Sequence, residues 1–232
     1  MQTGRITGVE ALVRWQHPQY GIVPPDQFIL PAERTGLIKP LTRWVLKEAL
    51  RQCRDWNQKG LPFNIAVNLS ARNLHDSQLP DRIAELLEVN GMSPSFLELE
   101  VTESAIMQDQ VCAKEILTRL SKMGIRLSID DFGTGYSSLG YLNHLPVDAI
   151  KIDRTFVRDM TENQNNAVIV RSLIDLGHNL GLEVIAEGVE NHETWDRLLA
   201  LGCDAAQGYY MSPPVSAQEI PRWMKESPWG LA

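Results

Sequence analysis

The chain has 232 residues, with 22 Lys and Arg against 29 Asp and Glu, a formal net charge of −7, and 44% hydrophobic residues. This composition is typical of a globular protein, and the acidic balance disfavours nucleic-acid polymers as partners, because neutralising phosphates takes a surplus of basic side chains. The three cysteines share no CxxC spacing, which argues against a disulfide scaffold or a cysteine metal site. No apolar run approaches the roughly 18 residues of a membrane span and no signal peptide is evident, so we expect a cytoplasmic segment without membrane contact.

Short β-rich runs alternate with amphipathic stretches along the whole chain, without a linker between them. Seven strands are predicted, at Arg5 to Trp15, Phe63 to Leu69, Phe96 to Thr102, Ile125 to Asp130, Asp148 to Asp153, Glu183 to Glu187 and Cys203 to Gln207. Helices are predicted between them at Leu41 to Lys59, Asp81 to Asn90, Val111 to Met123, Asn166 to Leu180 and Glu193 to Leu201. Repeated β-α-β units indicate parallel strands in one domain, residues 1–232. A doubly wound sheet and a (β/α)₈ barrel both satisfy this order.

Alternate residues of the predicted strands form an apolar set and a polar set. The polar set draws on nearly every strand and includes Glu10, Arg14, Asn68, Glu98, Glu100, Asp130, Lys151, Asp153, Glu187 and Gln207. A sheet covered by helices on both faces is almost continuously apolar, so these groups need an enclosed polar interior. Most of them also fall near the C-terminal ends of their strands, where barrel enzymes place catalytic residues. We therefore predict an α/β fold of the TIM-barrel type.

Oxygen ligands dominate the predicted barrel mouth. Six side chains would gather there: Glu10, Asn68, Glu100, Asp130, Asp131 and Glu187. A single buried carboxylate usually has a structural partner, but like charges this close together cannot all stay ionised without a cation. All-oxygen ligands favour Mg²⁺ or Mn²⁺, and two adjacent ions suit an in-line displacement at phosphorus. Lys151 would orient a water or stabilise phosphoryl oxygens, or would only neutralise Asp130.

The segment DDFGTGYSSLG, from Asp130 to Gly140, is the most glycine-rich stretch near these residues. Its spacing fits neither GxGxxG nor GxxxxGK[ST], so a nucleotide-cradling interpretation is weak. Two glycines after two aspartates are consistent with a mobile loop whose shape depends on metal or ligand, and equally with a plain βα connection. The five histidines have no HExxH spacing and are assigned no role.

Ordered motifs follow one another along the chain: GVEALVRW with Glu10-Ala11-Leu12, HPQYGIVPPDQFI, AERTGLI, NLSARNL, LELEVTES, DDFGTGYSSLGYLNHLPVDAIKIDRTFV, VIAEGVE and QGYYMSPP. Together they resemble the bacterial EAL-domain cyclic di-GMP phosphodiesterases. They cover essentially the whole chain. The resemblance implies a modified TIM barrel, in agreement with the strand pattern.

The resemblance also implies roles for individual residues. Glu10, Asn68, Glu100, Asp130, Asp131 and Glu187 would bind two Mg²⁺ or Mn²⁺ ions, and Ca²⁺ would allow binding but little catalysis. Water would open one phosphodiester of cyclic di-GMP to give linear pGpG, with Lys151 holding the water and Glu187 as a candidate base. Leu12, Arg14, Asp153 and Gln207 would serve substrate binding, with Gln207 supporting the metal waters. Glu103 would anchor the DDFGTGYSS loop, and Glu190 would be a further acid beside the site.

Two departures from the family pattern are visible. The usual FIPLAE appears as Phe28-Ile29-Leu30-Pro31-Ala32-Glu33, which we expect to alter a lid-like helix only locally. The chain also starts at the turn after the family's usual first strand, so we expect an N-terminally truncated EAL domain, 1–232, that lacks this strand. The strands near Arg5 to Trp15 and Cys203 to Gln207 would then be edges.

Three functions compete at this point. The leading one is an active metal-dependent phosphodiesterase. The second is a catalytically weak or inactive EAL module that binds cyclic di-GMP, which usually accompanies the loss of metal ligands. The third is a barrel lyase or isomerase in which Mg²⁺ stabilises an enolate, although two metals' worth of ligands suits phosphorus better. We expect a homodimer, and an upstream sensor, GGDEF or regulatory domain in the full-length protein.

Overall fold

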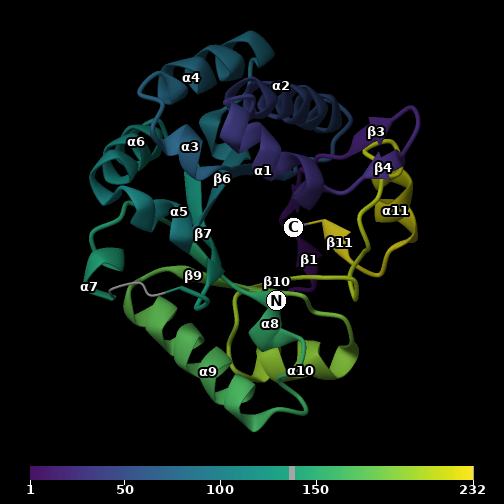
Figure 1. The fold of residues 1–232 in the computed structure, drawn as a ribbon. Coiled ribbons are helices and arrows are strands. Elements are labelled where there is room, and N and C mark those ends of the chain that lie inside the picture. The colour runs from purple at the N-terminus through teal and green to yellow at the C-terminus, as the bar shows by residue number, and fades with distance from the viewer. Residues whose placement is uncertain (136–138, 232) are drawn as a thin grey trace.

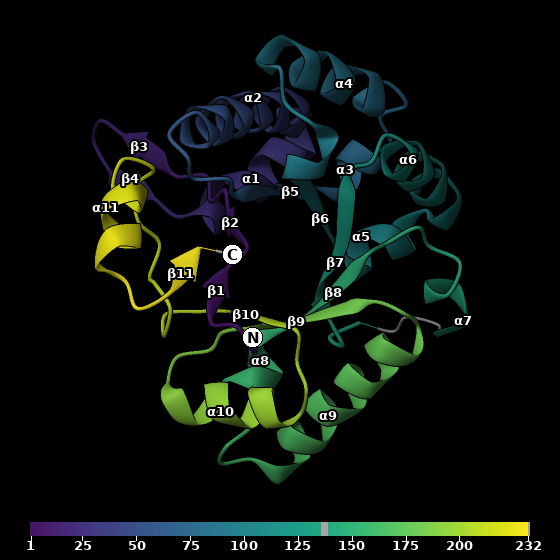
Figure 2. The same cartoon turned by 180° about the vertical axis from the view of Figure 1, so that it is seen from behind.

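The computed structural model describes residues 1–135 and 139–231. Its centre is a seven-stranded sheet in the order β10-β9-β8-β7-β6-β5-β2, in which every neighbouring pair is parallel. The strands are β2 (Gly8–Glu10), β5 (Asn64–Leu69), β6 (Leu97–Thr102), β7 (Arg126–Phe132), β8 (Ala149–Ile152), β9 (Glu183–Glu187) and β10 (Ala205–Gln207). The sheet curls around a central axis with helices outside it, a modified TIM barrel (Figures 1 and 2). The predicted fold class is confirmed, and the seven strands of this sheet match the predicted number.

Helices surround the sheet on its outer face. They are α1 (Pro25–Thr35), α2 (Ile38–Asn57), α3 (Ala71–Leu74), α4 (Leu79–Asn90), α5 (Glu103–Gln108), α6 (Gln110–Lys122), α7 (Leu139–Leu142), α8 (Arg154–Val157), α9 (Gln164–Asn179), α10 (His192–Ala200) and α11 (Ile220–Glu226), with a 3₁₀ turn at Pro94–Phe96. The five predicted helices are α2, α4, α6, α9 and α10, each within a few residues of its predicted bounds. Within the described part of the chain, no helix is long and apolar enough to cross a membrane.

The two faces of the strands separate as their sequence pattern predicts. Leu97, Leu99 and Val101 of β6 are completely buried in the core between sheet and helices. The alternate residues face the barrel interior, where Arg126 of β7 pairs with Glu98 (Nε–Oε2 3.1 Å) and with Glu183. Charge in the barrel interior is therefore compensated by ion pairs, and burial of the apolar face supplies the main stabilising contribution.

The prediction of a single strand from Arg5 to Trp15 is wrong. This region forms β1 (Arg5–Ile6), β2 and β3 (Trp15–His17), and β3 pairs antiparallel with β4 (Gly21–Val23) in a hairpin outside the barrel. The alternation of apolar residues continues from Val9 to Trp15, but pairing with β5 ends soon after Glu10, because the chain turns outward there. A period-two pattern carries no information about where the partner strand changes.

Strands β2 and β10 are the two edges of the seven-stranded sheet, as expected from the sequence. Near them, β1 pairs in parallel with β11 (Gly230–Leu231), which the sequence pattern did not predict. Trp229, just before β11, packs against Trp195 and Tyr210, with ring centroids 4.8 and 5.8 Å apart. Strands β1 and β11, near the two ends of the chain, therefore lie side by side between the sheet edges β2 and β10 (Figures 1 and 2).

Candidate active site

The carboxylate of Glu10 at the end of β2 is held from two sides. Asn68 Nδ2 on β5 donates to Glu10 Oε1 and Gln207 Nε2 on β10 donates to Glu10 Oε2, both at 2.6 Å. Because β2 and β10 are the edges of the sheet, the Gln207–Glu10 bond links them through side chains. Gln207, predicted near the metals, thus orients a predicted metal ligand directly.

Lys151 of β8 lies in the middle of the predicted acidic cluster and is only 1% exposed. Its Nζ is 2.7 Å from Glu100 Oε1, 2.6 Å from Glu187 Oε1 and 3.7 Å from Asp130 Oδ1. These partners come from β6, β9 and β7, so one ammonium joins the ends of several strands. The arrangement brings together residues that the sequence pattern placed at one barrel mouth.

Burial dominates the proton affinities of these acids. It raises the pKa of Glu100 to about 8 and that of Glu187 to about 7, although Lys151 favours their charged forms. Burial also disfavours the Lys151 ammonium, but the surrounding carboxylates keep the pKa of Lys151 well above its ordinary value. The cluster therefore has one firmly charged cation and several acids that ionise only at a cost.

Asp130 and Asp131 are adjacent in β7, and successive strand residues normally point to opposite faces. Here the pairing register with β8 shifts between Ile129 and Phe132, and Asp131 adopts a φ of 53°, in the left-handed region. Carboxylate oxygens of Asp130 and Asp131 consequently lie within 4.8 Å of each other and of Glu187. Burial, with the nearby Asp130 and Asp153 carboxylates, raises the pKa of Asp131 to about 6.

This donor set fits a hard divalent cation. Oxygens of Asp130, Asp131 and Glu187 share one small volume. In addition, Glu100 Oε2 is buried and has no hydrogen-bond partner among the residues that the structure describes. A buried carboxylate oxygen without a partner is costly, and a cation would supply the missing interaction.

Glu103, the first residue of α5, is 4% exposed and contacts the glycine-rich segment. Its Oε2 accepts hydrogen bonds from the backbone N–H groups of Gly133 (3.1 Å) and Gly135 (3.4 Å). A Cβ added at Gly135 would lie 2.7 Å from Glu103 Oε1, so the backbone approach requires glycine there. These contacts support the predicted anchoring role, while residues 136–138 of the same segment lie outside the described residues.

The other predicted site residues lie farther out or have internal contacts. Leu12 is 42% exposed, and Arg14 is exposed, with its Nη1 donating to the carbonyl oxygen of Val13 at 2.8 Å. Asp153 is 8% exposed, and its Oδ1 accepts from the backbone N–H of Thr155 at 2.9 Å, capping α8. Glu190 is exposed between β9 and α10. Their proposed roles toward substrate stay predictions.

Sequence reasoning missed a contact next to Asn68. Ser70, two residues after Asn68, donates from Oγ to Glu33 Oε1 of α1 at 2.6 Å, and its backbone N–H donates to Asn73 Oδ1 at 3.0 Å. Ser70 also caps α3. A serine followed three residues later by Asn73 is a capping signature that could have been recognised, but the distant partner Glu33 could not.

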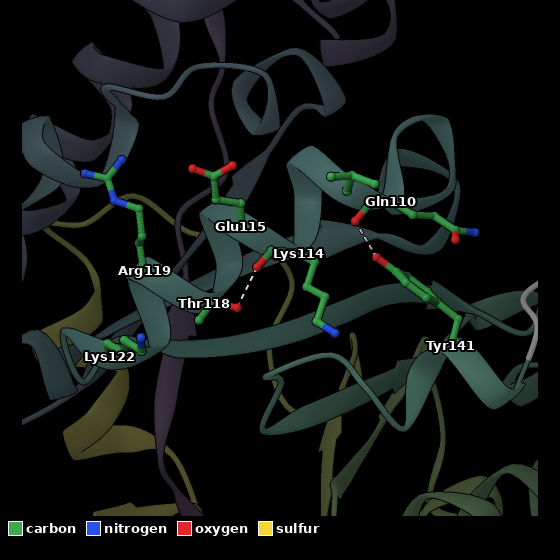
Figure 3. A pocket seen from close by; sticks show the side chains of 8 residues that line it. Gln110, Lys114, Glu115, Thr118, Arg119, Lys122 and Tyr141 are labelled. Atoms are coloured by element: carbon green, nitrogen blue, oxygen red, sulfur yellow. Dashed lines mark hydrogen bonds between the residues drawn. The ribbon is translucent and has the colours of Figure 1, made fainter.

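A cavity of about 550 Å³ is an open groove on the outer face of α6 and not at the barrel mouth (Figure 3). Its lining includes Val111, Lys114, Arg119 and Lys122. Tyr141 closes one end, where its hydroxyl donates to the carbonyl oxygen of Gln110 at 2.6 Å. The groove shares no residue with the acidic cluster, so the volume of this cavity does not indicate where the candidate active site lies.

A curled parallel sheet with carboxylates at the carboxyl ends of its strands defines a barrel protein with a candidate metal-dependent active site. The chain belongs to the EAL domain family, whose sequence model matches residues 1–214. The chain is 46% identical over 218 residues to MucR of Pseudomonas aeruginosa, named a bifunctional diguanylate cyclase/cyclic di-GMP phosphodiesterase; the match covers 94% of this chain and 32% of MucR. It is 39% identical over 222 residues to the cyclic di-GMP phosphodiesterase PdeR of Escherichia coli, covering 96% of this chain and 34% of PdeR.

Solved structures agree with this family membership. A MucR phosphodiesterase in complex with c-di-GMP superposes with a TM-score of 0.88 at 46% identity, covering 92% of this chain and 87% of that one. The FimX EAL domain from Pseudomonas aeruginosa, bound to c-di-GMP, has a TM-score of 0.82 at 28% identity, covering 88% of this chain and 82% of that one. The chain spans about a third of the length of the two curated relatives. EAL phosphodiesterases depend in general on metal ions.

Proposed function

We propose that this chain is a metal-dependent phosphodiesterase that hydrolyses cyclic di-GMP to linear pGpG. The observation that carries the proposal is the cluster around Lys151, in which Glu100, Asp130 and Glu187 converge at the barrel mouth. Relatives and solved neighbours named for cyclic di-GMP support the choice of substrate. An enolate-forming lyase or isomerase finds no support among these relatives.

We propose two Mg²⁺ or Mn²⁺ ions as cofactors. Glu10, Asn68, Glu100, Asp130, Asp131 and Glu187 would hold them, and the ions would supply positive charge to the phosphoryl oxygens and lower the pKa of the attacking water. Asn68 keeps its carbonyl oxygen for a cation because its Nδ2 is committed to Glu10. Gln207 holds the other oxygen of Glu10 and so fixes the direction of that carboxylate.

Residues of the chain itself then position the substrate and move protons. Lys151 stands where it can hold the attacking water or stabilise the negative charge on the phosphoryl oxygens. Glu187 lies beside Lys151, with its Oε1 2.6 Å from Lys151 Nζ, and is the candidate base that accepts the water's proton. Arg14 is exposed and can turn its guanidinium to a phosphate, and the exposed Leu12 can contact a base.

The test is hydrolysis of cyclic di-GMP by the purified chain, with products separated by ion exchange. We expect linear pGpG with Mg²⁺ or Mn²⁺, little with Ca²⁺, and none after chelation. Glu10→Gln and Asp130→Asn should each lower turnover by at least ~10²-fold, while Glu85→Gln on the exposed surface of α4 should not. Binding of cyclic di-GMP without turnover under every metal condition would instead support a non-catalytic binding module. Near-normal turnover in both site variants would refute the assignment of Glu10 and Asp130 to the active site.

We further propose that the EAL domain works as a homodimer and is linked in the full-length protein to a sensor, GGDEF or regulatory domain. The linked domain is supported by the lengths of MucR and PdeR, each about three times that of this chain, and by the cyclase in the name of MucR. Light scattering of the chain and sequencing of its parent gene test these two points. A monomer at all concentrations would exclude the homodimer for the isolated chain.

A further inference from the structure

A second set of metal-ligating side chains lies on the outside of the barrel. His75 follows α3, Asp109 lies between α5 and α6, and Cys112 is in the first turn of α6. One ligand atom from each residue lies within 4.8 Å of the other two, and His75 Nδ1 is 3.8 Å from Asp109 Oδ2. Helix α3 packs against α5 and α6, which brings these three loops and turns together (Figure 1).

We propose that His75, Asp109 and Cys112 form a binding site for a borderline-soft divalent ion of the Zn²⁺ type, separate from the barrel mouth. The donor chemistry distinguishes the two places. The mouth offers oxygen atoms, which suit Mg²⁺ or Mn²⁺, whereas this group offers an imidazole nitrogen, a thiolate sulfur and a carboxylate oxygen. Three protein ligands and a water complete a tetrahedral Zn²⁺ site.

The three side chains are accessible and pre-oriented. His75 and Asp109 are 43% and 38% exposed, so an ion can reach them from solvent. Asp109 Oδ1 accepts from the backbone N–H of Cys112 at 3.0 Å and caps α6, which leaves Oδ2 on the side of His75. Hydrogen bonding to Asp109 raises the pKa of the Cys112 thiol, so ion binding must displace a proton and should strengthen as pH rises.

The position of this group connects it to the glycine-rich segment. Helix α5 begins at Glu103, whose carboxylate accepts hydrogen bonds from the backbone of Gly133 and Gly135. The helix ends at Gln108, immediately before Asp109. On the other side, the carbonyl oxygen of Gln110 accepts from Tyr141, the residue shortly after that segment (Figure 3). An ion bound at Asp109 and Cys112 would therefore fix the junction of α5 and α6, which contacts Gly133 and Gly135 within the glycine-rich segment and Tyr141 just after it.

Cobalt replaces zinc with a visible signature and tests the site directly. The chain is titrated with Co²⁺ in excess Mg²⁺, and we expect a thiolate-to-cobalt charge-transfer band at one equivalent that Zn²⁺ abolishes. The band reports Cys112, because Cys53 and Cys203 are buried at 0% and 2% exposure. Cys112→Ser should remove the band. His75→Gln and Asp109→Asn, which keeps a capping side chain, should each weaken Zn²⁺ binding by at least ~10-fold.

A matched control is the exposed pair His192 and Asp196, with Nδ1 and Oδ2 2.9 Å apart. His192→Gln should leave the cobalt band unchanged. A second measurement needs no variant: bound Zn²⁺ should protect Cys112 of the unmodified chain from alkylation by iodoacetamide, as read by mass spectrometry. Persistence of the band in Cys112→Ser, or alkylation at the same rate with and without Zn²⁺, would overturn the proposal.

The site does not rest on the proposed phosphodiesterase activity. Failure of cyclic di-GMP hydrolysis leaves the cobalt band in place, whereas loss of the band leaves Mg²⁺-supported hydrolysis in place. Coupling between the two sites is measured separately, as a change in hydrogen exchange of the Gly133 amide when Zn²⁺ is added. Unchanged exchange at full Zn²⁺ occupancy would overturn the connection to the glycine-rich segment.

Discussion

The carboxylate of Glu103 should control local opening of the backbone that follows Asp131. A hydrogen bond to a charged group contributes about 1.5–3 kcal/mol, and the bond from Gly133 at 3.1 Å is well formed, whereas that from Gly135 at 3.4 Å is long and adds little. We therefore assign Glu103→Ala a loss of about 2 kcal/mol in the free energy of local opening. At about 1.4 kcal/mol per factor of ten, this corresponds to roughly 30-fold faster exchange of the Gly133 amide.

Hydrogen exchange by NMR measures this effect residue by residue. Glu103→Gln keeps the length of the side chain and one neutral acceptor, so exchange of the Gly133 amide in this variant should increase only about fivefold. Gly135→Ala disturbs the same contact through the backbone partner, because the added Cβ would lie 2.7 Å from Glu103 Oε1. Glu85→Ala, on an exposed helix face, is the control. An unchanged rate at Gly133 in Glu103→Ala, with an unchanged melting temperature, would falsify the anchoring role.

The remaining predictions concern the barrel mouth and its frame. Lys151→Met should lower turnover of cyclic di-GMP by at least ~10²-fold while changing ligand affinity in Ca²⁺ only a few-fold, as calorimetry would show; affinity lost in proportion to turnover would make Lys151 a binding residue. Burial raises the pKa of Glu187 from 4.5 to about 7, so the metal-free fold favours the protonated form of this side chain. The stability that protonated Glu187 contributes is therefore complete below about pH 4.5 and is lost as the pH rises through 7. The melting temperature of the unmodified chain minus that of Glu187→Gln should fall over this range, and a rise would reverse the sign of our argument. Gly208→Ala should destabilise the fold by about 1–3 kcal/mol or more in urea unfolding, because its Cβ would lie 2.1 Å from the carbonyl oxygen of Val189, whereas Gly230→Ala, with open space around it, should have little effect.

The barrel could be predicted because its strands carry two separate signals. The apolar parity of β6, with Leu97 and Leu99, marks the face toward the helices, and the polar parity, with Glu98 and Glu100, marks the interior. Both faces are enclosed, so the pattern is strong and its period of two is unambiguous. Parallel order then places the ends of the polar parity at one mouth, which is why Glu100 and Lys151 could be grouped before their 2.7 Å contact was seen.

Other features depend on contacts between distant segments and could not be predicted. Asp130 and Asp131 are both expected at the barrel mouth, but the parity rule alone sends them to opposite faces. The register shift against β8, which no local pattern predicts, is what brings both carboxylates to Glu187. Pairing of β1 with β11 joins residues at the two ends of the chain, and no local pattern specifies it. Short helices such as α3 are stabilised by caps and tertiary contacts more than by periodicity, so they left little signal.

The charges of the side chains at the barrel mouth bear on the number of divalent cations that can bind there. Glu10, Glu100, Asp130, Asp131 and Glu187 would carry five negative charges when ionised, and Lys151 offsets one of them. Four charges remain, which is the charge of two divalent cations, and a single cation would leave the cluster negative. Without cations the fold instead raises the pKa of Glu100, Glu187 and Asp131, so part of the excess charge is removed by protonation. Protons and metal ions therefore compete for the same oxygens, and the two-ion proposal requires that metal uptake release protons near neutral pH.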